Sequence, residues 1–316
     1  MSPRVTGIHH ITAIAGDAQR NLNFYVGTLG LRLVKLTVNF DDPFTYHLYY
    51  GDATGAPGTL LTFFPWRGVP PGRPGDGQVT RVAFAVPPSS LPFWEDRLRS
   101  FDVAFERLEP RFGEEILSFS DPDGMGLELV AAKDLGAPPP NSADAIPSRA
   151  AIRSFHSATL AEDGMERTAS LLTDTMGFRA AGEERNRFRF TVGQGGASRI
   201  VDVLCAPDSP QARMGAGSVH HIAWRTPDDA QQAQWRAELA GLRYNVSPIM
   251  DRTYFHSIYF REPGGVLFEI ATDPPGMDAD EPAGELGSSL KLPPWLEIQR
   301  EEIERRLPRL VLPIAR

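Results

Sequence analysis

One phrase recurs along this chain and limits the possible folds more than any other feature. "GIHHITAIAGD" stands near the N-terminus, and "SVHHIAWRTPDD" stands more than two hundred residues later. "VTRVAFAVPPSS" and "RSFHSATLAED" fit the same pattern once the histidines are allowed to vary. Each copy has apolar residues that suit a short strand, followed by the Ser, Asp or Pro of a helix start. The chain therefore contains four copies of one structural unit, which we call a module.

A helix is predicted after each of these strands. Apolar residues recur there at helical spacing, and three of the segments end at a glycine that suits the C-terminal end of a helix, namely Gly30, Gly177 and Gly241. The predicted helices are Ala18–Leu29, Leu91–Ser100, Met165–Met176 and Asp229–Ala240.

Strand-like runs follow each helix. They cover residues 31–40, 46–52 and 58–65 in the first copy, and residues 242–251, 255–263 and 265–273 in the fourth. In the second and fourth copies a turn of the acidic-Pro-x-Gly type leads into a last strand that carries a glutamate. Each module is therefore a strand, a helix and three strands (βαβββ), and the predicted fold class is α+β.

Segments rich in proline and glycine separate the modules. "GVPPGRPGDGQ" follows the first module and "GAPPPNSADAIP" lies at the middle of the chain. The predicted organisation is an N-terminal half, 1–140, with modules 5–66 and 78–133; a C-terminal half, 150–275, with modules 151–206 and 217–273; and a tail, 276–316. The tail contains "PPWLEIQREEIERRL", which predicts a short amphipathic helix that packs on the body or on a neighbouring subunit.

Composition excludes several classes of partner. The net charge of −8 and the pI of 5.4 provide no basic surface for nucleic acid. No apolar run approaches the roughly 20 residues of a membrane span, and the N-terminus does not resemble a secretory signal, so a cytoplasmic location is expected. Cys205 is the single cysteine, so any metal must be held by nitrogen and oxygen.

Four of the seven histidines form two doublets, at residues 9–10 and 220–221. Successive side chains on a strand point to opposite faces, so one histidine of each doublet is expected to face the cavity of a curved sheet. Each doublet then offers one inner ligand.

Several long blocks together resemble the vicinal oxygen chelate superfamily, which includes glyoxalases, bleomycin-resistance proteins and extradiol dioxygenases. The similarity covers nearly the whole chain, and it is closest to the hydroquinone-type ring-cleaving dioxygenases. The blocks are "HHIT", "NLNFYVGTLGLRLVKLTVNFDDP", "YHLYYGD", "GAPGTLLTFFPW", "VHHIAW", "DRTYFHSIYFREPGGVLFEIATD" and "LKLPPWLEIQREEIERRLP". The resemblance implies that the four modules form two pseudo-symmetric domains of curved, mixed sheet.

The resemblance also implies a metal site. It selects His10 and His221 as ligands, and the last strand of the fourth module supplies Glu269. Two imidazoles and one carboxylate with open positions are expected for a non-haem Fe(II) centre that admits substrate and O2 together, and Mn(II) could replace the iron. Modules 1 and 4 are then expected to share the metal cavity. For each histidine taken alone, a hydrogen-bonded core residue is the alternative.

The second and third modules act as an internal control. At the candidate ligand positions they have Arg81, Glu128, His156 and Asp202. Because an arginine side chain does not deprotonate to become a ligand, these residues suit a buried salt-bridge cluster better than a metal site. One metal site and one vestigial cavity are predicted.

Five further residues are candidates for the catalytic pocket. For His9 and His220 the resemblance implies that they orient the ligands or touch the substrate, and the alternative is a bond to backbone carbonyls. Thr12 lies two residues after His10 on the same strand face, so it either lines the pocket or packs in the core. For Arg252 and Tyr259 the resemblance implies a place in the substrate pocket, against an exposed arginine and an ordinary core tyrosine.

The predicted activity is Fe(II)-dependent cleavage of a hydroquinone- or catechol-type ring by O2, with a small aromatic molecule as substrate and a homo-oligomer as a possible assembly. A glyoxalase-like isomerase or lyase is one alternative, but it normally needs a fourth protein ligand where this chain has Thr62. A non-enzymatic binding protein of the bleomycin-resistance type is another, and it needs no metal ligands. His256 is expected to be structural.

Overall fold

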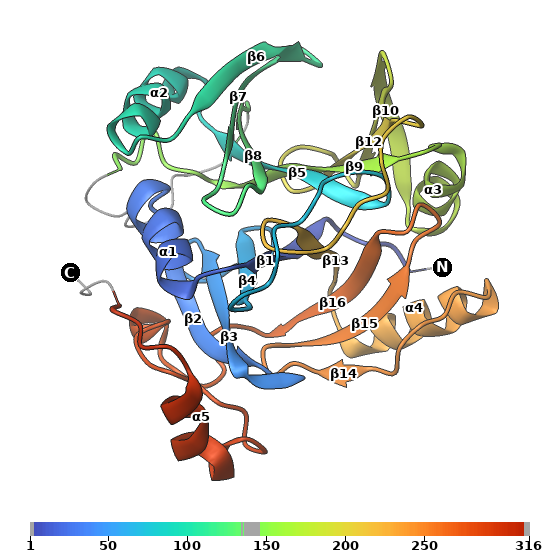
Figure 1. The fold of residues 1–316 in the computed structure, drawn as a ribbon. Coiled ribbons are helices and arrows are strands. Elements are labelled where there is room, and N and C mark those ends of the chain that lie inside the picture. Colours follow the sequence, from blue (N-terminus) through green and yellow to red (C-terminus); the bar gives the residue numbers. More distant parts are fainter. Residues whose placement is uncertain (1–2, 134, 136–145, 313–316) are drawn as a thin grey trace.

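The computed structural model describes residues 3–133, 135 and 146–312, and two eight-stranded sheets dominate it (Figure 1). The order of strand, helix and three strands repeats four times, as predicted. The first sheet contains, in spatial order, β14 (Met250–Asp251), β15 (Phe255–Arg261), β16 (Leu267–Pro275), β13 (Val219–Thr226), β1 (Ile8–Ala15), β4 (Leu60–Pro65), β3 (Asp42–Gly51) and β2 (Arg32–Asn39). The second contains β10 (Phe178–Glu184), β11 (Arg187–Val192), β12 (Ile200–Cys205), β9 (Ser154–Glu162), β5 (Gln78–Val86), β8 (Gly126–Ala131), β7 (Glu114–Ser120) and β6 (Phe105–Arg111).

Each sheet combines modules from different halves of the chain. The first sheet joins modules 1 and 4 where β1 pairs with β13, and the second joins modules 2 and 3 where β5 pairs with β9. Both junctions are antiparallel, whereas β1/β4 and β13/β16 are parallel. The predicted α+β fold with two curved, mixed sheets is confirmed. The sheets do not coincide with the halves 1–140 and 150–275, since each contains one module from each half.

The predicted helices are present. They are α1 (Ala18–Leu22) continued by η1 (Asn23–Thr28), η2 (Pro88–Ser90) with α2 (Leu91–Ser100), α3 (Glu166–Ser170) continued by η3 (Leu171–Thr175), and α4 (Asp229–Gly241). Gly30 and Gly177 follow their helices with positive φ angles of 68° and 84°, as a helix-terminating glycine requires. Gly241 is instead the last residue of α4, and Arg243 takes the left-handed conformation, with a φ of 67°.

The strand predicted at residues 242–251 is wrong for most of its length. Only Met250–Asp251 is a strand, β14, at the edge of the first sheet. The left-handed Arg243 turns the chain directly after the helix, and Pro248 has no amide proton to donate to a ladder. The Tyr244 ring packs on Phe260 instead, with ring centroids 5.5 Å apart.

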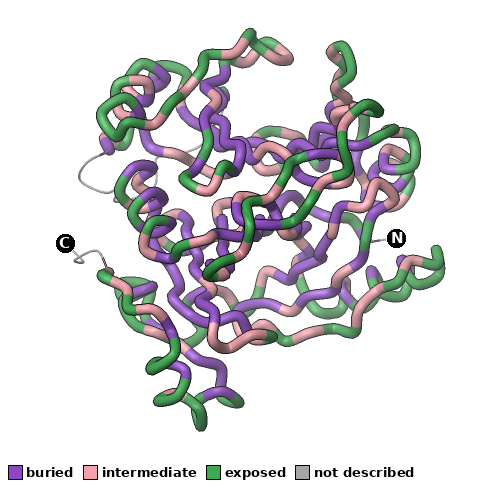
Figure 2. Tube along the Cα trace, in the orientation of Figure 1, coloured by how far each residue is buried: buried purple, intermediate pink, exposed green. Residues whose placement is uncertain are grey.

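The main core lies where the helices meet the sheets. Figure 2 shows the strands as largely buried and the helices as exposed on one side. Tyr25, Trp94, Leu172 and Trp235, one from each helical segment, are fully buried in one apolar cluster with residues of both sheets. The candidate site residues on the strands do not belong to this cluster.

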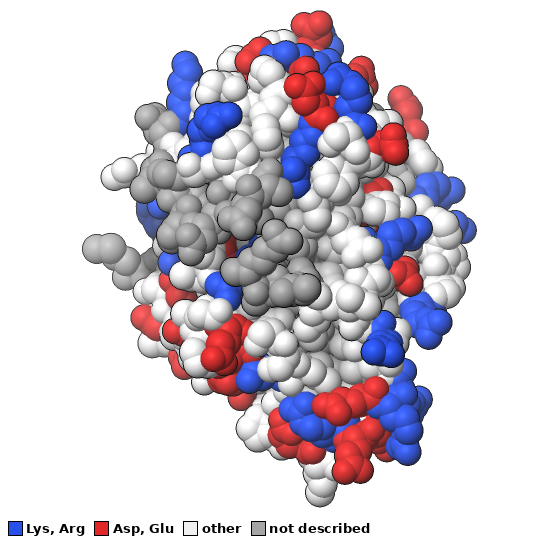
Figure 3. Space-filling model, turned by 90° about the vertical axis from the view of Figure 1, so that its left-hand side faces the viewer, with Lys and Arg blue, Asp and Glu red and all other residues white. Residues whose placement is uncertain are grey.

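The C-terminal tail folds back on module 1, as one of the two predicted arrangements requires. It contains η4 (Ala283–Glu285), η5 (Glu297–Gln299) and α5 (Arg300–Arg306). The hydroxyl of Tyr46 donates to the carbonyl of Pro308, 3.0 Å away, and Ile303 is fully buried. The exposed side of α5 carries acidic and basic side chains that intermingle at the bottom of the molecule (Figure 3), where Arg300 pairs with Glu304.

Two connecting segments were predicted as linkers. The segment at 68–78 leads from β4 into the start of β5, whereas the one at 136–147 lies largely outside the described residues. Within the described ranges, none of the helices is long and apolar enough to cross a membrane.

Candidate metal centre

The structure brings the three predicted ligands together on the concave face of the first sheet. His10 comes from β1, His221 from β13 and Glu269 from β16, and all three are buried. The two Nε2 atoms lie 3.2 Å apart, and Glu269 Oε2 lies 2.9 Å from His221 Nε2 and 3.4 Å from His10 Nε2. In the described part of the chain, these residues form the one group of three histidine, cysteine, aspartate or glutamate side chains whose donor atoms all lie within 4.8 Å of one another.

These distances suit a metal ion. Three neighbouring ligands of an octahedral ion with bonds of about 2.1 Å lie about 3 Å from one another. Glu269 Oε2 is buried and receives no hydrogen bond of good geometry, so it remains available to a cation. Burial alone would raise the pKa of Glu269, but His10 and His221 hold it well below its usual range. The site therefore offers an ionised carboxylate and two imidazole nitrogens.

The expectation that one histidine of each doublet faces away from the cavity is wrong. The register of the β1/β13 ladder shifts at two points, which leaves His9 and His220 as extra residues. Such β-bulges interrupt the alternation of a strand and turn the extra side chain toward its neighbour. As a result, His9 Nδ1 lies 2.9 Å from His10 Nδ1, and His220 Nδ1 lies 2.8 Å from His221 Nδ1.

These contacts determine which ring nitrogen of each inner histidine is free to bind a metal. A histidine that offers the Nε2 lone pair to a metal carries its proton on Nδ1 and needs an acceptor there. Burial, followed by the charge of His10, holds the pKa of His9 well below its usual value. Burial and the charge of His221 lower the pKa of His220 to about 3. Both outer histidines are therefore neutral and can accept the Nδ1 proton of the inner ones.

Ser257, on β15, is a site residue that the sequence analysis missed. Its hydroxyl donates to Oε1 of Glu269, the carboxylate oxygen that does not face the histidines. Ser257 lies two residues before Tyr259 on the same strand, so strand alternation counted from Tyr259 could have identified it. The bond fixes the orientation of the carboxylate.

Thr12 lies on the cavity face, next to the ligands. Its hydroxyl oxygen is 2.8 Å from that of Thr62, on the neighbouring strand β4. Thr62 is also 2.8 Å from Nε2 of His47, on β3. His47 was not among the predicted site residues, because no motif or repeat in the sequence distinguishes it.

Arg252 and Tyr259 lie together at the β15 side of the cavity. The Arg252 guanidinium is 5.6 Å from the centre of the Tyr259 ring, and it also pairs with Asp41 of module 1 at 2.9 Å. Burial, followed by the charge of Glu269, raises the pKa of Tyr259, which therefore keeps its proton at neutral pH. The pair provides a permanent positive charge and a hydroxyl donor.

One assignment in the second sheet needs correction. Asp202 pairs with Thr159 in the β9/β12 ladder as Glu269 pairs with Ala223 in β13/β16. Two residues before Thr159 stands Ser157, so Ser157 and not His156 has the register of a ligand. His156 is the bulged residue, and its Nδ1 lies 3.0 Å from the Ser157 hydroxyl, as His9 and His220 lie beside their neighbours.

The second concave face holds ion pairs, as predicted, but with different arginines at the centre. Arg189 pairs with Asp202 at 2.8 Å and with Glu114 at 2.7 Å, and Arg111 pairs with Glu128. The Arg81 side chain is 42% exposed, and its Nε lies as far as 3.9 Å from Glu128 Oε1, so Arg81 lies at the margin of the ion-pair cluster. These charges neutralise one another and leave no free ligand set.

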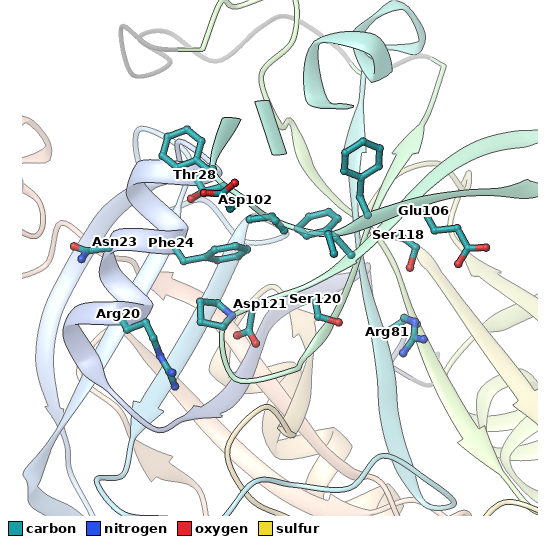
Figure 4. A pocket seen from close by; sticks show the side chains of 16 residues that line it. Arg20, Asn23, Phe24, Thr28, Arg81, Asp102, Glu106, Ser118, Ser120 and Asp121 are labelled. Carbon is teal, nitrogen blue, oxygen red and sulfur yellow. The ribbon is translucent and has the colours of Figure 1, made fainter. Parts of the chain in front are cut away.

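A separate open hollow of about 810 Å³ lies between α1/η1 and the β6–β7 region (Figure 4). Its walls include Phe24, Asp102, Asp121 and Ser120. The candidate metal ligands do not line it, so it is distinct from the site described above.

Comparison with known proteins identifies the family of the chain. The family model "Glyoxalase/Bleomycin resistance protein/Dioxygenase superfamily" matches residues 7–129 and 154–270. The chain is 46% identical to "Putative ring-cleaving dioxygenase MhqO" of Bacillus subtilis over 97% of each chain. It is 37% identical to "Chlorohydroquinone/hydroquinone 1,2-dioxygenase" of Sphingobium indicum over 96% of each chain.

A solved structure from Bacillus subtilis, described as a "putative dioxygenase", superposes with a TM-score of 0.95 at 45% identity and covers 99% of each chain. The two pseudo-symmetric sheets and the clustered histidines and glutamate are thus set in a fold shared along the entire length. The chain belongs to the glyoxalase/bleomycin resistance protein/dioxygenase superfamily.

Proposed function

We propose that this protein is an Fe(II)-dependent dioxygenase that opens a hydroquinone- or catechol-type ring with O2. The observation that carries the proposal is the buried set of His10, His221 and Glu269, whose donor atoms converge from three strands. Two histidines and one carboxylate leave coordination positions open, which suits a non-haem iron site better than a closed structural one. The names of the similar proteins from Bacillus subtilis and Sphingobium indicum support the same class of reaction.

The protein side chains would prepare this chemistry in distinct ways. Iron, when bound, lowers the pKa of a phenolic hydroxyl and mediates electron transfer between the ring and O2. His9 and His220 accept the Nδ1 protons of the ligand histidines, and Ser257 holds Glu269. These bonds keep the three donor atoms converged.

The remaining polar groups act on the substrate. Arg252 presents a fixed positive charge that stabilises an anionic oxygen, and Tyr259 retains a proton that it can donate. The burial of the ligands excludes water from reactive species. Substrate identity, a cytoplasmic location and a homo-oligomeric state stay predictions, and Mn(II) would fit the same ligands.

Thr62 supports an open site over a glyoxalase-like one. It has the register on β4 that Glu269 has on β16, because Thr62 pairs with Tyr49 and Glu269 with Tyr259. Its hydroxyl is engaged by Thr12 and His47, and it offers no carboxylate as a fourth ligand.

Oxygen uptake tests the proposed function. Protein reconstituted with Fe(II) under nitrogen is mixed with aerobic hydroquinones and catechols, with metal-free protein as the control. We expect iron-dependent uptake of about one O2 per ring opened, and loss of both uptake and iron retention in His221→Ala. Bound iron without uptake on any diphenol would contradict the proposal and favour an isomerase or lyase, for which glutathione thiohemiacetals are the next substrates.

A further inference from the structure

The metal cavity has two facing walls that are related by the pseudo-symmetry of modules 1 and 4. On the module 4 wall, Ser257 and Tyr259 of β15 stand beside Glu269. On the module 1 wall, His47 and Tyr49 of β3 stand beside Thr62 in the same register. His47 therefore occupies the place that Ser257 has in module 4, but a large aromatic ring with two nitrogens replaces a hydroxyl.

The His47 ring has a fixed orientation. Its centroid lies 4.1 Å from that of Tyr49 and 4.3 Å from that of Phe64, and its Nε2 is 2.8 Å from the Thr62 hydroxyl. Among the residues that the structure describes, none makes a hydrogen bond to His47 Nδ1, and that atom is not among the buried polar atoms left without a partner. His47 is half-buried, and its Nδ1 is therefore accessible to a small molecule.

Several other polar groups of the cavity are already engaged. The Nδ1 atoms of His9 and His220 face the ligand histidines. The Thr12 hydroxyl contacts that of Thr62, and the Arg252 guanidinium lies over Tyr259 and binds Asp41. On the module 1 wall, His47 Nδ1 and the Tyr49 hydroxyl are thus the polar groups that no hydrogen bond of the described residues occupies, and His47 Nδ1 belongs to the ring that Thr62 holds in place.

His47 is close enough to the metal ligands for their charges to affect it. Burial, followed by the charges of His10 and His221, holds the pKa of His47 well below its usual value. The neutral ring carries one proton. If Nε2 accepts a hydrogen bond from the Thr62 hydroxyl, Nδ1 carries the proton and donates; if Nε2 donates to Thr62, Nδ1 accepts. A phenolic hydroxyl can take either role.

We propose that His47 is a specificity-determining residue that hydrogen-bonds, through Nδ1, the hydroxyl of a diphenol that the metal does not hold. This inference rests on the proposed function, because it needs a diphenol with its first oxygen at the metal. A site built to bond a hydroxyl discriminates against an analogue without it, since the site's own polar group is then left unpaired.

Binding without turnover tests the inference. The protein is loaded with Mn(II) under nitrogen, and the affinities for hydroquinone and for 4-methylphenol, which replaces one hydroxyl by a methyl group, are measured by calorimetry. We expect the wild-type protein to prefer hydroquinone at least tenfold. In His47→Phe the preference should fall to within about twofold of unity, while the metal content stays at the wild-type value.

His256→Phe is the matched control. His256 pairs with Asp229 at 2.6 Å outside the cavity, so this variant should keep the wild-type preference. A full preference for hydroquinone in His47→Phe would overturn the inference. If His47→Phe fails to fold or to bind metal, Thr62→Val replaces it, because that variant keeps the imidazole but removes the group that holds Nε2.

Thr62→Val should also lower the preference at unchanged metal content, and an unchanged preference would overturn the inference. Oxygen uptake by the wild-type protein separates the two proposals. If the wild-type protein takes up O2 but the variants keep the full preference for hydroquinone, only the role of His47 is contradicted. No uptake on any diphenol contradicts the proposed function, while the binding preference is still measured without O2.

Discussion

Single residues behind the ligands decide the geometry of the candidate metal centre. The bulges at His9 and His220 turn two outer histidines toward two inner ones, so that each ligand position has its own acceptor for the Nδ1 proton. Glu269 is held by a different device, the hydroxyl of Ser257. Such partners of metal ligands typically contribute 10–100-fold in metal affinity.

Replacement of Ser257 by alanine should therefore weaken metal binding without unfolding the protein. The freed Oε1 of Glu269 lets the carboxylate rotate away from the histidines, and we expect the dissociation constant for Fe(II) or Mn(II) to rise about tenfold. Anaerobic metal titration measures this. Ser100→Ala, at the exposed end of α2, serves as the control and should bind metal like the wild type. Wild-type affinity in Ser257→Ala would exclude an orienting role for this hydroxyl.

At the scale of elements, the acidic hairpin turns fasten helices to sheets. Asp121, in the β7–β8 turn, accepts the hydroxyl of Tyr25 as well as amides of its own turn. Glu262, in the β15–β16 turn, accepts the hydroxyl of Thr168 and likewise two amides of its turn. In both cases the helical partner belongs to another module, so the turn that recurs in the sequence joins modules that are not in the same sheet.

Glu162, at the end of β9, adds a second carboxyl group next to Glu262. Both of its oxygens are buried without a hydrogen-bond partner, and its side chain lies against Gly264. Burial, followed by the charge of Glu262, raises the pKa of Glu162 to about 8. The folded protein therefore keeps a proton on this group that the unfolded chain releases at ordinary acidic pH.

This proton makes stability depend on pH. The folded pKa of about 8 lies above the ordinary value of 4.5, so the contribution is complete below about pH 4.5 and is lost as the pH rises to 8. We expect the free energy of unfolding in urea to decline across this range in the wild type and to decline less in Glu162→Gln. Asp163→Asn, at the exposed neighbouring position, should retain the wild-type slope. Identical slopes in Glu162→Gln and the wild type would contradict the assignment.

At the scale of the whole molecule, the tail is bonded to the modules that form the first sheet. Lys35, on β2, is fully buried, and its Nζ lies 2.6 Å from Asp280 and 3.3 Å from Glu281 of the tail. The same Nζ lies 4.7 Å from the centre of the Tyr254 ring, whose hydroxyl donates to Asp280. The tail is thus tied to both modules that form the metal cavity.

Loss of Lys35 should destabilise the protein strongly, because Asp280 would lose its cation and the buried Glu281 would keep only the more distant Lys291. We expect Lys35→Met to lower the free energy of unfolding by about 3 kcal/mol or more. The double variant Lys35→Met/Glu281→Gln should recover part of this loss, since it removes the uncompensated charge. Lys291→Met is the control: Lys291 is partly exposed and 3.5 Å from Glu281, so its loss should be about 1 kcal/mol or less. A loss in Lys35→Met no larger than in the control would contradict this account.

The sequence by itself determined the repeated module, because strand and helix periods and turn residues act over a few neighbouring residues. The two histidine doublets limited the candidate ligands to one histidine of each pair, and the resemblance to the superfamily selected His10, His221 and Glu269. The strand predicted at 242–251 did not form, because the left-handed Arg243 and Pro248 interrupt the pattern locally.

Tertiary structure alone decided how the side chains meet. The bulges that turn His9 and His220 inward, and that give Ser157 rather than His156 the register of a ligand, arise from pairing between strands of different modules. His47 and Ser257 are placed in the cavity by pairings within their own modules, of β3 with β2 and of β15 with β16. Strand register across modules depends on contacts between residues far apart in sequence, and local periodicity carries no information about it.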